Sequence, residues 1–294
     1  MAKTAAAVQQ YWADQLELMQ TLPAEVHTRQ PESIHDLRAA GRRLKATARL
    51  YRPLIRPKLA SELIEQLDWY NSQLGQARDA EVIAEEVAEL LDNRPGARAV
   101  IAALEAEARR TAHLADRMLG SEAAAEVLRV VAELVDDPWP APGGAPTDDQ
   151  VLGRVRWAEK RVAREWRAGP TGGEGPLEWA HRLRRRAKAA RYAAESVEDA
   201  IPESKKKAVG YARVATLLGI VQDTVVIKRA LMVWPTALVT EPVAARERLA
   251  EEASSEVPQA VREALPADLR GKGLSRGEAE FESRSFDGLV EHDQ

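Results

Sequence analysis

The chain has 294 residues, of which 45% are hydrophobic and 30% charged, and its formal net charge at pH 7 is −4. This composition is that of an ordinary folded protein and excludes an intrinsically disordered chain. The absence of cysteine excludes disulfides, thiolate nucleophiles and cysteine metal sites. The N-terminus lacks an apolar stretch of signal-peptide length, and no window approaches the roughly 18 apolar residues of a membrane span. We therefore expect a soluble, cytoplasmic protein without a membrane partner.

The sequence predicts an all-α fold, because good helix formers dominate and the period-2 alternation typical of strands is scarce. Prolines and glycines separate the expected helices. In the first half we expect helices at 4–21, 33–52, 58–92, 97–119 and 122–136. In the second half we expect helices at 148–168, 177–200, 204–233 and 242–253. Ser33 is the predicted N-cap of the second helix.

The distribution of these breakers predicts four segments. A proline- and glycine-rich stretch separates two helical halves, and the last residues are rich in glycine, serine and acids with little periodicity. The expected segments are a first helical bundle at 1–137, a linker at 138–147, a second helical bundle at 148–265 and a flexible acidic tail at 266–294.

The pattern of a basic helix occurs twice in the chain. His35, Arg38, Arg42 and Lys45 recur 146 residues later as His181, Arg184, Lys188 and Arg191. At 100° per residue, offsets of 3, 7 and 10 place each set within a sector of about 80° on one helix face. We call these sets the first and the second stripe. Arg49 continues the register of the first stripe, as Arg52 would if the helix ran on.

Other features of the two regions recur in the same order. Leu74-Gly-x-x-Arg-Asp79 is echoed by Leu218-Gly-x-x-Gln-Asp223, at an offset of 144. Apolar positions also match and predict a core-facing side opposite the cations. In the first copy these positions are Leu37, Gly41, Leu44, Ala48, Tyr51 and Ile55. In the second they are Leu183, Ala187, Ala190, Ala194, Val197 and Ile201. We interpret this as an internal duplication of a helical unit.

Cations gathered on one face favour a long anionic ligand, because like charges along a helix repel one another. Arginine forks bind phosphate oxygens, and a histidine beside an anion gains a proton. The alternative is that each stripe pairs with acids of neighbouring helices. Arg182, Arg185 and Arg186 lie outside the main sector, and Arg154, Arg161 and Arg164 share another helix face; we interpret both groups as ordinary surface charge.

The two His-x-x-Arg-x-x-x-Arg/Lys patterns and the following Leu-Gly-x-x-Arg-Asp-x-x-Val-Ile motif at 74–83 resemble the CHAD domain, the conserved histidine α-helical domain. The resemblance covers about residues 5–253. It implies two four-helix bundles related by pseudo-twofold symmetry around a central basic surface. It also implies binding of inorganic polyphosphate and association with polyphosphate granules. The implied binding residues are His35, Arg38, Arg42, Arg43, Lys45, Arg49, Arg52, His181, Arg184, Lys188 and Arg191.

The second copy departs from the first in having Ala189 in place of Arg43 and Gln222 in place of Arg78. We expect a non-catalytic protein with no cofactor and no metal, since the stripes hold no clustered carboxylates and the chain has no Gly-x-x-x-x-Gly-Lys-Ser/Thr loop. A nucleic-acid-binding protein is the first alternative, and an enzyme acting on a phosphorylated substrate is the second. The oligomeric state is not predicted.

Overall fold

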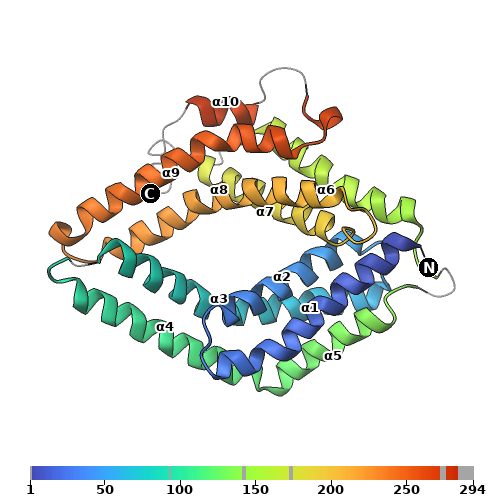
Figure 1. The fold of residues 1–294 in the computed structure, drawn as a ribbon, viewed down its shortest axis with the longest axis horizontal. Coiled ribbons are helices and arrows are strands. Elements are labelled where there is room, and N and C mark those ends of the chain that lie inside the picture. Colours follow the sequence, from blue (N-terminus) through green and yellow to red (C-terminus); the bar gives the residue numbers. More distant parts are fainter. Residues whose placement is uncertain (1, 93, 141–143, 172–174, 272–275, 284–294) are drawn as a thin grey trace. The chain divides into compact units, whose positions relative to one another are not determined.

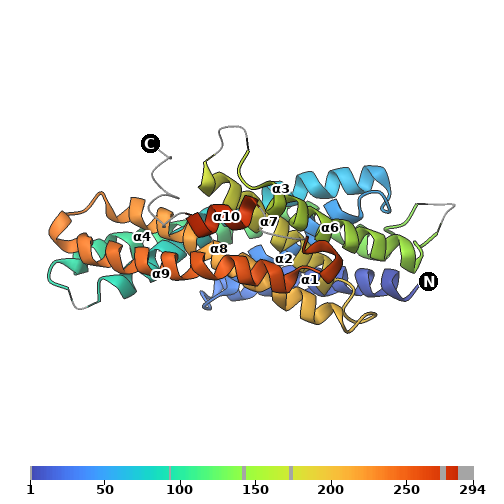
Figure 2. The ribbon, with the colours of Figure 1, turned by 90° about the horizontal axis from the view of Figure 1, so that it is seen from above.

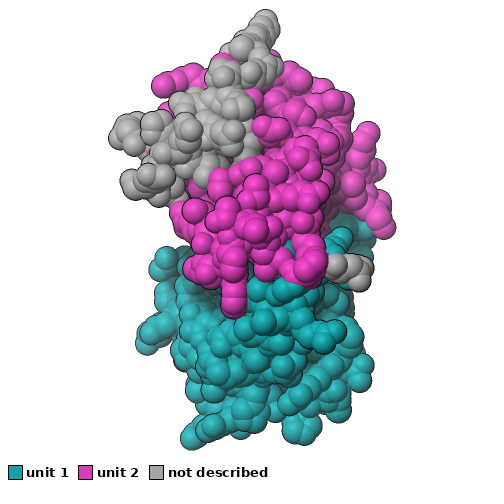
Figure 3. All heavy atoms as spheres, turned by 90° about the vertical axis from the view of Figure 1, so that its left-hand side faces the viewer, with its two compact units in different colours: residues 1–92, 96–154, 196–201 teal, residues 93–95, 155–195, 202–294 magenta. Residues whose placement is uncertain are grey.

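The computed structural model describes residues 2–92, 94–140, 144–171, 175–271 and 276–283 (Figure 1). Over these residues the regular structure is helical and no β-strand occurs, which confirms the all-α prediction. The chain divides into two compact units. Unit 1 comprises residues 1–92, 96–154 and 196–201, and unit 2 comprises residues 93–95, 155–195 and 202–294 (Figure 3).

Within the described residues, the helical residues 148–154 belong to unit 1 together with five whole helices. The whole helices are α1 (Lys3–His27), α2 (Ser33–Tyr51), α3 (Pro57–Leu90), α4 (Ala97–Leu119) and α5 (Glu122–Asp136) (Figure 1). Helix α1 packs against α2 and α5, and the long helix α3 packs against α2, α4 and α5. Helix α2, which carries the first stripe, therefore lies between α1 and α3.

Two aromatic side chains in the core of unit 1 have hydrogen-bonded polar atoms. Trp12 is fully buried and donates from Nε1 to Thr47 Oγ1 of α2 at 3.0 Å. The hydroxyl of buried Tyr51 lies 2.9 Å from Ser196 Oγ. The expected linker is also in contact with this core, because Trp139 packs on Trp12 with ring centroids 5.6 Å apart. These contacts hold the core-facing side of α2 in place.

Unit 2 contains the second stripe. Its helices are α6 (Asp148–Ala168, residues up to 154 belonging to unit 1), α7 (Pro176–Glu195), α8 (Ser204–Leu231), α9 (Thr236–Ala264), η1 (Ala267–Leu269) and α10 (Arg276–Ser283). Helix α8 packs against both α7 and α9, and α10 lies along α9 (Figure 2). Trp166 of α6 stacks on Trp179 of α7 at 6.0 Å between ring centroids.

Two helices run through prolines and are longer than predicted. Helix α1 continues past Pro23 to residue 27, and α9 begins at residue 236 and passes both Pro242 and Pro258. A proline inside a helix removes one backbone hydrogen bond, but packing of the apolar face can offset that loss. Leu22 and Val26 are buried beside Pro23, and Val257 and Val261 are buried around Pro258.

Two helix ends also differ from the prediction. The N-cap of α2 is Glu32, in a left-handed conformation with φ of 64°, while Ser33 is already helical and donates from Oγ to the Gln30 carbonyl at 2.8 Å. Helix α7 ends at Glu195 rather than at residue 200. The reason is that residues 196–201 belong to unit 1, where Val197 is fully buried.

Part of the segment expected to be a flexible tail is helical and packed. Phe281 of α10 is 5% exposed and lies 5.9 Å from Trp166 and 5.4 Å from Trp179 between ring centroids. Glu278, also buried, pairs with Arg262 of α9. Burial of one aromatic ring and one paired carboxylate therefore holds α10 on unit 2. The acid-rich composition of this segment gave no indication of that packing. Residues 284–294 lie outside the described residues.

Candidate functional site

The cations of α2 lie on the side of the helix that faces away from the core of unit 1. Leu37, Leu44 and Ala48 are fully buried, as the repeated apolar pattern predicted. In the second copy Leu183, Ala187, Ala190, Ala194 and Val197 are buried and Ile201 is half-buried. Among the predicted binding residues of unit 1, two are exposed, Arg49 and Arg52. Five are half-buried: His35, Arg38, Arg42, Arg43 and Lys45.

Carboxylates of α3 lie beside the first stripe. Arg38 Nη1 donates to Asp79 Oδ1 at 2.9 Å. Lys45 and Arg49 share Asp68, with Arg49 Nη2 at 2.8 Å from Oδ2. The alternative interpretation of the stripe, pairing with acids of a neighbouring helix, therefore holds for these three cations. Two carboxylates among three cations leave the group with an excess of positive charge.

His35 lies at the start of α2 among charges of both signs. Its Nδ1 is 3.9 Å from Glu32 Oε2. Burial and then the guanidinium of Arg78 lower the pKa of His35 below its usual 6.5, although Glu32 and Asp36 act in the opposite direction. Arg78 was not among the predicted site residues. The sequence did contain a signal for it, since Arg78 directly precedes Asp79 in the repeated motif.

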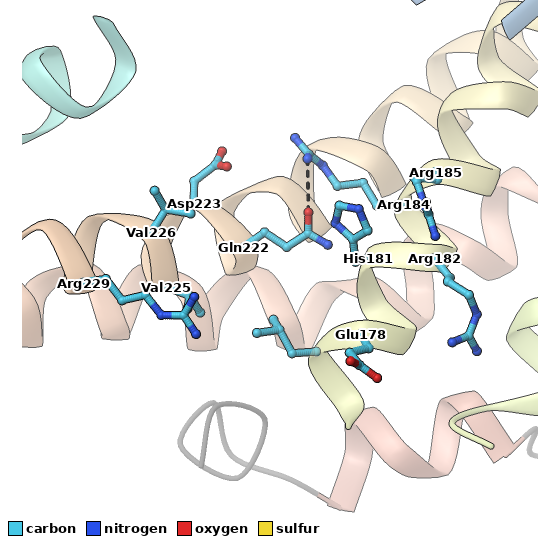
Figure 4. Close-up of a pocket in the computed structure, with 11 residues that line it drawn as sticks. Glu178, His181, Arg182, Arg184, Arg185, Gln222, Asp223, Val225, Val226 and Arg229 are labelled. Carbon is cyan, nitrogen blue, oxygen red and sulfur yellow. Dashed lines mark hydrogen bonds between the residues drawn. The ribbon is translucent and has the colours of Figure 1, made fainter. Parts of the chain in front are cut away.

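The second stripe opens into a pocket between α7 and α8 of about 610 Å³. Helix α7 contributes His181, Arg184 and Arg185, and α8 contributes Asp223 and Arg229. Figure 4 shows the imidazole of His181 next to the hydrogen bond that joins Arg184 to α8. The pocket thus brings together cationic groups from two consecutive helices.

Arg184 and Arg38 make similar contacts in the two copies. Arg184 donates from Nη1 to Gln222 Oε1 at 3.1 Å and from Nε to the Ala215 carbonyl at 3.2 Å. A Cβ built on Gly219 would lie 3.0 Å from the Arg184 guanidinium. The equivalent distance from Gly75 to Arg38 is 3.5 Å. Each arginine therefore crosses a glycine of the following helix, a likeness that is compatible with internal duplication.

The C-terminal end of the second stripe is paired within its own helix. Arg191 Nε donates to Glu195 Oε1 at 2.6 Å, and its guanidinium lies 5.7 Å from the centroid of the Tyr192 ring. Lys188 is half-buried. This intrahelical pair makes the pocket end of α7 the more strongly cationic part of the stripe.

Three arginines of the pocket were not predicted as binding residues. Arg182 and Arg185 were interpreted as ordinary surface charge, and Arg229 was not singled out. Arg229 follows Gln222 by seven residues, so both lie on one face of α8, and that spacing was available in the sequence. The sequence did not show that this face lies opposite α7, because that depends on how the two helices pack.

Among the described residues, no group of three or more His, Cys, Asp or Glu side chains is arranged to hold a metal ion. No helix within the same ranges is long and apolar enough to cross a membrane.

Comparison with known proteins decides the family. The sequence model of the CHAD domain matches residues 10–232, which is more than half of the chain. The chain belongs to the CHAD domain family. The match to the CHAD domain runs from α1 to the end of α8 and includes both stripes and the pocket, whereas α9 and α10 lie beyond it.

Two solved structures resemble this CHAD protein. The CHAD domain from the plant Ricinus communis is 22% identical, with a TM-score of 0.66, and the match covers 97% of this chain and 93% of that chain. PptA from Streptomyces chartreusis is 18% identical, with a TM-score of 0.65, and the match covers 87% of this chain and 98% of that chain. At these identities the similarity shows the shared fold alone. None of the curated proteins matches the chain significantly.

Proposed function

We propose that this CHAD protein binds inorganic polyphosphate through the first stripe and through the pocket at the second stripe, without catalysing a reaction on it. The observation that supports this most directly is the pocket, where His181, Arg184, Arg185 and Arg229 gather while Asp223 and Glu178 are the acids among its lining residues. One guanidinium group can donate two parallel hydrogen bonds to two oxygens of a phosphate. A chain of phosphates presents such oxygens at regular intervals.

Polyphosphate fits this pocket better than nucleic acid does. Recognition of single-stranded nucleic acid relies on aromatic rings that stack on the bases. The described lining of the pocket contains no phenylalanine, tyrosine or tryptophan. A ligand that consists of phosphates alone needs no such ring. Polyphosphate binding would also place the protein on polyphosphate granules in the cytoplasm, and we include that location in the proposal.

The structure decides which residues should be changed to test the proposal. Arg38 and Arg184 are bonded to α3 and α8, so reversing their charge would disturb helix packing as well as binding. Arg49, Arg52, His181 and Arg229 are exposed. We define the site variant as Arg49→Gln, Arg52→Gln, His181→Gln and Arg229→Gln. A matched control, the α4 variant, carries Arg98→Gln, Arg109→Gln and Arg117→Gln, all exposed positions of unit 1. Each variant removes three arginine charges.

The experiment is a titration of the purified protein with long-chain polyphosphate at two salt concentrations, with duplex DNA as competitor and with release of phosphate followed in the same samples. Binding that neutralises phosphates weakens steeply with salt, by roughly one unit of log–log slope per contact. We expect the site variant to bind at least tenfold more weakly, with a slope smaller by about three. The α4 variant should bind like the natural chain.

Equal affinity of the site variant and the natural chain would overturn the assignment of the residues. Displacement of polyphosphate by equimolar duplex DNA would favour the nucleic-acid alternative. Release of phosphate above background that the site variant loses would favour an enzyme.

A further inference from the structure

A second group of arginines lies between α6 and α7 in unit 2. Both helices contribute side chains around the half-buried carboxylate of Glu165. Arg182 Nη2 lies 2.9 Å from Glu165 Oε1, and Arg186 Nε lies 3.8 Å from Glu165 Oε2. The charges of Arg161, Arg182 and Arg185 act on Arg186, and the charge of Arg164 acts on Arg161. We call these five residues the α6–α7 arginine cluster.

Positive charge exceeds negative charge in this cluster. Within the residues that the structure describes, Arg161, Arg164 and Arg185 form no ion pair. Burial and then the neighbouring Arg161 lower the pKa of Arg186. Burial and then Arg164 do the same to the pKa of Arg161. Glu165 acts in the opposite direction on both pKa values, but it is one carboxylate among five arginines. The excess of like charge destabilises the fold unless a further anion lies among the arginines.

One arginine of the cluster is held by an aromatic ring. The guanidinium carbon of Arg161 lies 4.6 Å from the centroid of the Trp157 ring. This arrangement fixes the guanidinium by a cation–π contact. The Trp157 side chain nevertheless remains 39% exposed. An exposed ring beside a group of arginines is a suitable surface for a planar group attached to a phosphate chain.

The first copy shows that the helix does not need these arginines in order to pack. At the offset of 146 residues, Arg182, Arg185 and Arg186 correspond to Asp36, Ala39 and Ala40 of α2. Ala39 and Ala40 are buried in unit 1. The cluster is therefore a property of the second copy alone. A purely structural role would not explain why this copy carries additional unpaired arginines.

We propose that the α6–α7 arginine cluster is a second phosphate-binding site, whose ligand carries two or more linked phosphate groups. The site shares its ligand chemistry with the proposed function, but Arg161, Arg164 and Arg186 belong to the cluster and not to the lining of the pocket. Two sources offer that chemistry: an inorganic phosphate chain, bound by the arginines alone, and a nucleoside triphosphate, whose base would also stack on Trp157. Arg182 and Arg185 also line the pocket, so the test leaves both unchanged.

The test uses the cluster variant Arg161→Gln, Arg164→Gln and Arg186→Gln, in the natural chain and in the site variant. Glu165 keeps Arg182 as a partner in both. The probes are inorganic tripolyphosphate and adenosine triphosphate, measured by calorimetry without divalent cations. In the site variant we expect one remaining binding event for at least one probe, and addition of the cluster substitutions should weaken it at least tenfold. The α4 variant should bind both probes as tightly as the natural chain does.

The outcomes separate this proposal from the previous one. If the site variant binds neither probe, or if the cluster substitutions leave its binding unchanged, the second site does not exist, whatever the first site does. If the cluster substitutions remove a binding event that the site variant retains, the second site exists even where the site variant shows no defect with long-chain polyphosphate.

A further substitution distinguishes the two sources. For a nucleoside triphosphate site, Trp157→Ala should weaken binding of adenosine triphosphate by about tenfold more than binding of tripolyphosphate, in line with the loss of one stacked base. For an inorganic chain, Trp157→Ala should affect both probes equally. Either result supports a phosphate site in the cluster and identifies its ligand.

Discussion

The guanidinium groups of Arg38 and Arg184 each lie over a glycine of the following helix, so they serve packing as well as charge. A glycine in a helix is about 0.5–1 kcal/mol less stable than an alanine, unless the missing Cβ leaves room that a neighbour uses. At Gly75 a Cβ would be 3.5 Å from Arg38, an ordinary contact. At Gly219 it would be 3.0 Å from Arg184, closer than such contacts normally are.

The two glycines are therefore expected to respond differently to alanine. Gly75→Ala should raise the free energy of unfolding by about 0.5–1 kcal/mol. Gly219→Ala should raise it less or lower it, because Arg184 would have to move from its bonds to Ala215 and Gln222. Urea denaturation of both variants measures the difference. An equal gain at both positions would show that Arg184 is not held tightly.

His35 is expected to report on the ligand through its pKa. In the free protein the pKa lies below 6.5, chiefly because of burial and Arg78. A lowered pKa means that the folded state prefers the neutral imidazole, so the stabilisation is present above pH 6.5 and is lost as the pH falls through the folded-state pKa. His35→Gln should remove this part of the pH dependence of stability.

A bound polyanion should act on His35 in the opposite direction, because phosphate stabilises the imidazolium. An NMR titration of His35 with and without polyphosphate measures both values. We expect a higher pKa in the complex and, by linkage, tighter binding as the pH falls from about 7 to 6. An unchanged pKa would place His35 outside the binding surface.

At the scale of elements, the helices depend on which apolar faces are buried more than on which breakers the sequence contains. Helices α1 and α9 continue through prolines, and α10 forms in a segment whose composition is acidic. In each case the segment carries buried apolar side chains, such as Val26, Val261 and Phe281. Tertiary burial contributes more than local propensity does in such segments.

Phe281→Ala is expected to release α10 from unit 2. Truncation of a buried phenylalanine costs roughly 3–5 kcal/mol, and undocking of the short helix limits the loss to the lower part of that range. Trp166 and Trp179, which are 2% and 0% exposed, would then meet water. The tryptophan emission should shift to longer wavelength, and the midpoint of urea denaturation should fall. Phe281→Leu is the control, and identical spectra for all three proteins would contradict the packing role of α10.

At the scale of the whole molecule, the net charge of −4 describes the chain poorly. Residues 29–58 contain nine lysines and arginines against two acids, whereas residues 276–294 contain six acids against two arginines. What an anion meets is the local field, which falls off over about 10 Å at ordinary salt. An acidic protein can therefore bind a polyanion, provided that its cations are gathered on one surface, as they are in the pocket.

Much of this protein was predictable from its sequence. The all-α class, most helix boundaries and the apolar and cationic sides of α2 and α7 follow from composition and helical period, because those properties depend on residues near one another in the chain. The recurrence of the two motifs indicated the family, and the match over residues 10–232 shows it.

The tertiary structure alone decided which cations face a carboxylate and which line a pocket. Asp68 and Asp79 neutralise part of the first stripe from α3, and Arg229 joins the second stripe from α8. The α6–α7 arginine cluster likewise assembles from two helices around Glu165. These arrangements depend on contacts between residues far apart in the chain. Helical period gives the direction of a side chain from its own helix axis, but only packing determines which other helix lies there.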